Sequence, residues 1–169
     1  PGMVKTYSIP ESSRHETEEN YTHVIITNNA LAPSFEALRD HRIAKGVSST
    51  IITIEEIGSS VEAIRNWIRD TAYSQWNTEY VLLGGYSGII PVKKIAASGA
   101  GESDNIPADM YYGCLDPWED LTHEVWIGRA AVANSAEVNN LTNKIIAYEN
   151  STDNYLKKAS MVGEYLGFG

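Results

Sequence analysis

Short apolar runs bounded by polar or turn-forming residues recur along the chain and predict the strands of a buried sheet. Several of these runs are rich in β-branched residues, which is typical of strands that are covered on both faces. The expected strands are Thr22–Thr27, Ser49–Ile54, Tyr80–Leu83, Val125–Arg129 and Ala159–Gly163.

Between the runs, apolar residues recur at helical spacing and predict three helices. The first helix starts near Pro33 or Ser34 and ends at Gly46, a residue type that is common after a last helical turn. The second is expected to begin at the capping residue Ser60, and the third at Asn134 or Ser135. The apolar stripe of the second helix consists of Val61, Ile64, Ile68 and Ala72, with Trp67 beside it; that of the third consists of Val138, Leu141, Ile145 and Tyr148.

The order of strands and helices predicts an α/β fold. Alternating strands and helices call for a mostly parallel sheet with right-handed crossovers and helices on both faces, a three-layer arrangement. Residues 1–20 are polar and predict an extended lead-in or a covering arm, whereas residues 21–169 form a single α/β domain. Between the third and fourth strands we expect a loop or exposed hairpin at Ala96–Asn105 and a short edge strand at Asp109–Leu115.

The last expected strand lies a few residues before Gly169, and this position indicates that the chain is part of a longer α/β unit. A closed five-stranded domain that ends in its last strand is the alternative interpretation. The strand at Tyr80–Leu83 is followed by Gly84 and Gly85, which allow a sharp turn. In open α/β sheets, ligands and catalytic groups gather at this carboxyl edge.

Composition excludes several function classes. The formal net charge is −9, with 13 Lys and Arg against 22 Asp and Glu, which argues against a nucleic-acid partner. Apolar residues make up 43% of the chain, enough to bury a core, but no apolar run has membrane-spanning length. No strand is followed by a phosphate-binding glycine–lysine loop or by the spaced glycines of a dinucleotide site. Asn28 and Asn29 stand where a phospho-receiver domain would carry acidic residues.

The chain has a single cysteine, Cys114, so it cannot form an intrachain disulfide. Cys114 lies between Gly113 and Leu115 in an apolar run, where a lone cysteine is usually a small buried hydrophobe. A catalytic thiol needs a base and an electropositive setting. No sequence context marks a base among the four histidines, which are His15, His23, His41 and His123.

Acidic residues crowd one stretch of the chain, at Asp104, Asp109, Asp116, Glu119, Asp120 and Glu124. Several carboxylates that converge from a loop suit a hard cation such as calcium, which takes six to eight oxygen ligands. The candidate calcium ligands are Asp109, Asp116 and Asp120. A solvated acidic loop without a metal is the alternative interpretation. No other cofactor is indicated.

Taken together in their order and spacing, six sequence blocks resemble the gingipain-type cysteine peptidases. The blocks are Val24–Asn28, Phe35–Leu38 through Lys45–Gly46, Tyr80–Gly85 with Pro91–Val92, Ile106–Tyr112, Val125–Arg129 and Asn143–Glu149. The resemblance covers residues from about 20 to 165 and corresponds to the N-terminal part of that family's catalytic domain.

The resemblance implies a caspase-like fold in two side-by-side subdomains, of which this chain would be the first. It also implies a secreted or cell-surface protein that cleaves protein or peptide substrates, with the remaining half of the catalytic domain as its partner. In that family the catalytic histidine precedes a glycine, and it lies with the cysteine in the second subdomain. No histidine here precedes a glycine, and the cysteine motif is absent, so the catalytic dyad is expected outside this chain.

Two positions of the family pattern bear on calcium binding and on the orientation of the catalytic histidine. Family members often keep an aspartate directly after the Leu-Leu-Gly-Gly block, but Tyr86 stands there, which weakens any calcium site on that loop. Some members carry a glutamate just past the last strand that orients the catalytic histidine, and Glu164 is the nearest match. A carboxylate there could fix the imidazole tautomer. A solvent-facing loop acid is the alternative for Glu164.

Two functions of different classes remain open from the sequence. The first is the N-terminal subdomain of a cysteine endopeptidase, a hydrolase whose thiolate attacks a peptide carbonyl. In that case this chain would supply a scaffold and part of the substrate cleft, and would be inactive alone. The second is a binding or assembly module that uses the same fold without the dyad.

Overall fold

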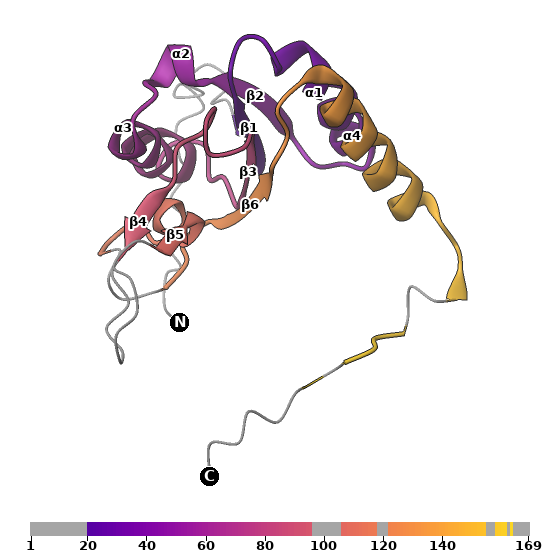
Figure 1. The fold of residues 1–169 in the computed structure, drawn as a ribbon. Coiled ribbons are helices and arrows are strands. Elements are labelled where there is room, and N and C mark those ends of the chain that lie inside the picture. Colours follow the sequence, from indigo (N-terminus) through magenta and orange to yellow (C-terminus); the bar gives the residue numbers. More distant parts are fainter. Residues whose placement is uncertain (1–19, 96–105, 118–121, 155–157, 162, 164–169) are drawn as a thin grey trace, which may run out of the picture.

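A four-stranded parallel sheet in the order β2-β1-β3-β6 forms the centre of the computed structural model (Figure 1). The structure describes residues 20–95, 106–117, 122–154, 158–161 and 163. The sheet consists of β1 (His23–Thr27), β2 (Ser49–Thr53), β3 (Tyr80–Gly84) and β6 (Trp126–Ala130). His23 lies beside Ser49 and Tyr80, and Tyr80 lies beside Trp126, so all four strands start at one edge. The predicted parallel α/β sheet is therefore confirmed.

One face of the sheet is covered by α1 (Ala32–Ala44) and α4 (Ser135–Asn150), which pack side by side (Figure 1). α4 begins where expected, because the Asn134 side chain accepts a hydrogen bond from the Glu137 N–H at 3.1 Å. Gly46 follows α1 with a φ of +83°, a conformation that glycine adopts without strain. The core on this face consists of Ile25, Leu31, Phe35, Leu38, Ala130, Val132 and Val138.

The other face is covered by α2 (Ile54–Ile57), α3 (Val61–Trp67) and a π-helical segment, Ile68–Tyr73. Ser60 caps α3 as predicted, since its hydroxyl accepts from the Ala63 N–H at 3.0 Å. The predicted continuous helix widens after Trp67, where the N–H of Ser74 bonds to a carbonyl five residues earlier. The core here consists of Val24, Ile26, Ile64, Ile68, Val81, Leu83, Ile90, Tyr112, Leu115 and Val125.

An antiparallel pair, β4 (Lys93–Ile95) and β5 (Ile106–Ala108), flanks residues 96–105, which lie outside the described residues. The predicted edge strand at Asp109–Leu115 is wrong, because residues Asp109–Tyr112 form a 3₁₀ helix. Tyr111 and Tyr112 explain the difference. Consecutive side chains of a strand point to opposite faces, whereas the helical turn lets both neighbouring rings be buried.

The predicted last core strand at Ala159–Gly163 is also wrong over the residues that the structure describes there. Residues 158–161 and 163 are exposed and lie in no strand, and Met161 is 95% exposed. The reason is the course of α4, which leads the chain away from the sheet, so that this segment has no strand beside it (Figure 1). Of the lead-in at 1–20 the structure describes only Asn20, which is exposed.

Candidate functional site

The carboxyl ends of β1 and β3 meet at the edge where the sequence predicts the chemistry. Thr27 is fully buried, and its hydroxyl donates to the Gly84 carbonyl at 2.6 Å. A Cβ on Gly84 would lie 2.7 Å from the Phe35 ring, and one on Gly85 would lie 2.8 Å from Ile89. Neither glycine has a positive φ. Close packing at this edge is therefore the reason that both positions are glycine. The sequence suggested instead that the glycines provide the conformational freedom for a sharp turn, and the structure does not require that freedom.

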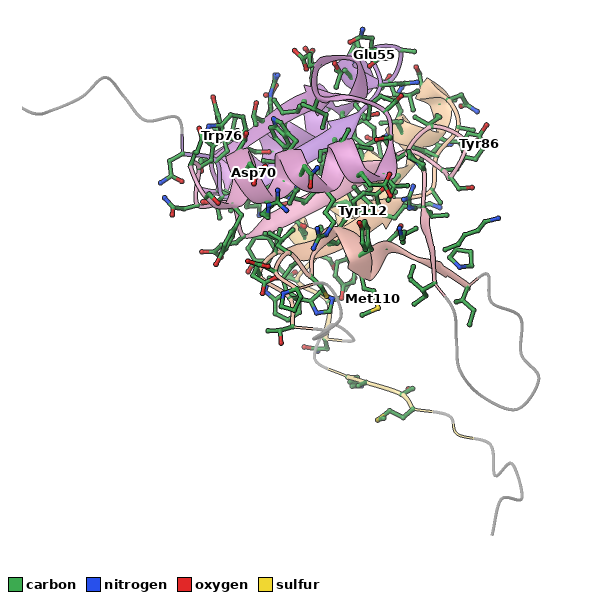
Figure 2. All side chains as sticks on the ribbon, turned by 90° about the vertical axis from the view of Figure 1, so that its left-hand side faces the viewer. Glu55, Asp70, Trp76, Tyr86, Met110 and Tyr112 are labelled. Carbon is green, nitrogen blue, oxygen red and sulfur yellow. The ribbon has the colours of Figure 1, made fainter. Side chains whose placement is uncertain are left out.

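Polar groups beyond these strand ends are ordered by hydrogen bonds to the backbone. The Asn28 side chain accepts from the Leu31 N–H at 3.0 Å, and the Asn29 N–H donates to a Glu55 carboxylate oxygen, also at 3.0 Å. Tyr86 is 46% exposed and lies at the end of the sheet remote from Trp76 (Figure 2). This edge therefore offers a fixed polar surface with an exposed ring.

Arg129, the fourth residue of β6, connects this edge to the hairpin that precedes it. Its guanidinium binds both oxygens of the Asp109 carboxylate at 2.7 Å, and it donates to the carbonyls of Gly85 and Ile90 at 2.7 and 2.8 Å. Two parallel bonds between guanidinium and carboxylate are among the stronger polar contacts in proteins. Arg129 is not among the residues that the sequence marks as functional. The alternation of side chains along the strand could have revealed that Arg129 points inward, because it falls on the same face of the strand as Ile127.

Tyr112 reinforces the same connection. Its hydroxyl donates to the Pro91 carbonyl at 2.7 Å, while its ring is fully buried. Burial is the main reason that the pKa of Tyr112 is raised above its usual range. The phenol therefore remains a neutral hydrogen-bond donor that holds the loop after β3 against the 3₁₀ helix.

A buried arginine on α3 holds the segment that contains Cys114. Arg65 is 8% exposed and donates to the carbonyls of Tyr111, Cys114 and Leu115 at 2.6–3.3 Å. It occupies a position of the α3 apolar stripe, four residues after Val61, and this pattern could have revealed it in the sequence. Cys114 is fully buried, which confirms that it packs as a small hydrophobe and cannot reach a peptide substrate.

His23 starts β1 at the opposite edge of the sheet. Its Nδ1 lies 2.8 Å from the Ser49 hydroxyl, and the residue is 8% exposed. Burial, with the nearby Arg42 charge as a smaller cause, lowers the pKa of His23 to about 4. This histidine is therefore neutral near pH 7 and remote from the carboxyl edge.

The other described histidines make structural contacts. His41 Nε2 lies 2.9 Å from a Glu149 oxygen, which joins α1 to α4, and the His123 ring stacks on Trp126. His15 lies outside the described residues. The part of the chain that the structure describes therefore presents no solvent-exposed thiol for an imidazole to activate, since its single cysteine is buried.

The candidate calcium ligands are not brought together in the part that can be described. Both oxygens of Asp109 are bound by Arg129, and Asp116 is exposed in the turn that follows Leu115. Asp120 and Glu164, the candidate histidine-orienting carboxylate, lie outside the described residues. Over the described ranges no three acidic, histidine or cysteine side chains gather as a metal site would require. The calcium site and the role of Glu164 stay predictions.

Comparison with known proteins identifies a family for most of this chain. Residues 16–167 match the model of peptidase family C25. A comparison with curated protein sequences found no match.

Within the described ranges, no helix combines the length and the apolar character that crossing a membrane requires.

Three solved structures, two of RgpB and one of PorU, share this fold. The crystal structure of the Arg-specific cysteine proteinase gingipain R (RgpB) is 23% identical with a TM-score of 0.64, and the match covers 79% of this chain and 29% of that one. The complex of the Porphyromonas gingivalis RgpB pro- and mature domains is 22% identical with a TM-score of 0.63, covering 75% and 28%. Dimeric latent PorU from Porphyromonas gingivalis is 18% identical with a TM-score of 0.61, covering 78% and 16%. The chain thus spans less than a third of each structure.

Proposed function

The chain belongs to peptidase family C25, and we propose that it is the N-terminal subdomain of a gingipain-like cysteine endopeptidase. Its four-stranded parallel sheet shares the caspase-like fold of the gingipain R structure, of which it covers 29%. The observation that carries the proposal is this partial coverage together with a single cysteine that is fully buried. The subdomain would act as a scaffold, with the catalytic histidine and cysteine in the part of the domain outside this chain.

In the intact protein, a thiolate would attack the carbonyl carbon of a peptide bond, with histidine as the general base and then as the acid for the leaving amine. The contribution of this chain would be positional. The carboxyl edge, with Asn28, Glu55 and Tyr86, would form part of the substrate cleft, and Arg129 would keep the loop after β3 in place. Support for this location comes from the general tendency of ligands to bind at the carboxyl ends of parallel strands.

The test compares this chain with the same polypeptide extended downstream of Gly169 to the end of the matching domain. We expect the extended protein to cleave a peptide library and to lose activity on alkylation with iodoacetamide, while the 169-residue chain cleaves nothing. Cys114→Ser is the matched control, and it should leave the activity of the extended protein intact. Thiol-dependent cleavage by the short chain would refute the assignment of roles. An extended protein that has no histidine–glycine motif and no second cysteine would instead support a non-catalytic module.

We further propose that the parent protein is secreted or displayed on the cell surface, which family resemblance supports. Fractionation of the source cells with an antibody against this chain tests the location. Recovery of the protein from the cytoplasm alone would contradict it.

A further inference from the structure

An apolar groove lies on the sheet face that α1 and α4 cover elsewhere. It has a volume of about 560 Å³ and is formed over the first halves of β3 and β6. Tyr80 and Trp126 face each other as neighbours in the two strands and are 46% and 65% exposed. The residues that line the groove are Thr22, His23, Arg42, Val47, Tyr80, Val81, Leu82, Trp126, Ile127 and Gly128.

The groove is open because α4 leaves the sheet. Val138 and Thr142 in the first half of α4 are buried, whereas Tyr148 near its end is 57% exposed. The last turn of α4 is instead bound to α1, through Glu149 to Arg42 and through Asn150 to Lys45. Over the described residues, β6 also has no strand on its outer edge. A face of this kind is unusual in a complete domain, because adjacent aromatic side chains are normally covered.

The Arg42 and His23 side chains of the groove already have partners. The Arg42 guanidinium binds the Glu149 carboxylate, and the His23 imidazole binds the Ser49 hydroxyl. An acidic occupant would therefore meet a cation whose charge is already balanced by a carboxylate. An apolar occupant would cover Tyr80 and Trp126 without needing a charged partner, and a large aromatic side chain buries about 150–250 Å² when it is covered.

We infer that this groove and the outer edge of β6 form the surface on which the following part of the catalytic domain packs, with apolar side chains against Trp126 and Tyr80. The inference rests on the proposed function, since it takes the rest of that domain as the occupant. Two observations support this choice. The match covers only 29% of the gingipain R chain, and Asn150, from which the chain continues, is bound to Lys45, the residue after α1 and three positions from the groove residue Arg42. Ala159 and Met161, further along the chain, are exposed and therefore available for packing.

The experiment uses the parent polypeptide extended to the end of the matching domain. Trp126→Asp places a charge in the groove, and Tyr73→Asp is the matched control, since Tyr73 is 42% exposed outside the groove. We expect Trp126→Asp to lower the Tm by about 5 °C or more and Tyr73→Asp by about 1 °C. Trp126→Phe, which keeps an apolar ring, should stay close to the parent Tm. Hydrogen exchange should show protection in the extended protein for those β6 amides that do not bond to β3.

Each alternative outcome is decisive. Equal Tm shifts for the two aspartate variants, or fast exchange of these β6 amides in the extended protein, would overturn the inference. A stable dimer of the extended protein that Trp126→Asp dissociates would also overturn it, because a second copy would then occupy the groove. Failure of the proposed function is seen separately. If the extended protein has no peptidase activity but Trp126→Asp is still selectively destabilising, the interface is supported and the proposed function is refuted.

Discussion

At the scale of single residues, two inward-facing cations hold the irregular parts of the molecule together. Arg129 fixes the loop after β3 and the 3₁₀ helix, and Arg65 fixes the turn around Cys114. Both donate mainly to backbone carbonyls, which have few partners of their own in segments without regular structure. Removing either side chain would therefore leave several acceptors without a donor as well as a cavity.

Arg129→Met should lower the free energy of unfolding by about 2–4 kcal/mol, because it leaves the Asp109 carboxylate and two carbonyls without their donor. Urea denaturation measures the change. Arg39→Met is the matched control, since Arg39 pairs with Asp40 at the surface, where ion pairs contribute about 0–1 kcal/mol. Equal costs for the two variants would show that the Arg129 contacts do not stabilise the fold.

His23 should make stability depend on pH. Its pKa is about 4 in the folded protein and about 6.5 when unfolded, so the folded state favours the neutral ring. Its contribution is complete above pH 6.5 and is lost as the pH falls through 4, because the unfolded state binds the proton first. Between pH 7 and pH 4.5 we expect a loss of about 2–3 kcal/mol from this group.

The contribution of His23 is measured as a difference between variants, because carboxylates titrate in the same range. Urea denaturation at both pH values should show a smaller loss for His23→Gln than for the parent chain. The same loss in His23→Gln as in the parent would contradict a neutral buried ring.

At the scale of elements, β3 and α1 are fitted closely at the carboxyl edge. Gly84→Ala should cost about 1–3 kcal/mol, because its Cβ would lie 2.7 Å from the Phe35 ring in a packed core. Gly128→Ala is the matched control in β6, where the nearest atom to the new Cβ is 3.9 Å away. We expect it to be neutral or slightly stabilising. Thermal unfolding of both variants measures the difference, and a neutral Gly84→Ala would mean that the ring moves aside easily.

The regular elements were largely predictable because each has a local cause. Four predicted strands form, and Ser60 and Asn134 cap their helices, since apolar runs and capping residues act over a few neighbouring positions. The π-helical segment after Trp67 and the 3₁₀ helix at Asp109–Tyr112 were not predictable in this way. Their conformations depend on tertiary contacts, such as those that Arg65 makes with carbonyls 46 to 50 positions along the chain.

At the scale of the whole molecule, local patterns could place the candidate site at the carboxyl edge but could not supply its contacts. Asp109 illustrates the limit, because a carboxylate in an acidic stretch suggested calcium, whereas the fold brings Arg129 to it. Trp126 illustrates it again. An apolar run predicted a core strand, but β6 lies at the edge of the sheet, and the course of α4 leaves Trp126 largely exposed.

The two cores lie on opposite faces of one sheet, so we expect them to unfold together. Leu38→Ala, which creates a cavity on the α1 face, should cost about 2–5 kcal/mol. The variant is best studied with Trp118 and Trp126 replaced by Phe, so that emission comes from Trp67 and Trp76 on the other face. Because the strands contribute side chains to both cores, the fluorescence and circular dichroism midpoints should fall equally. A fluorescence midpoint that stays in place while the circular dichroism midpoint falls would show that the two layers unfold independently.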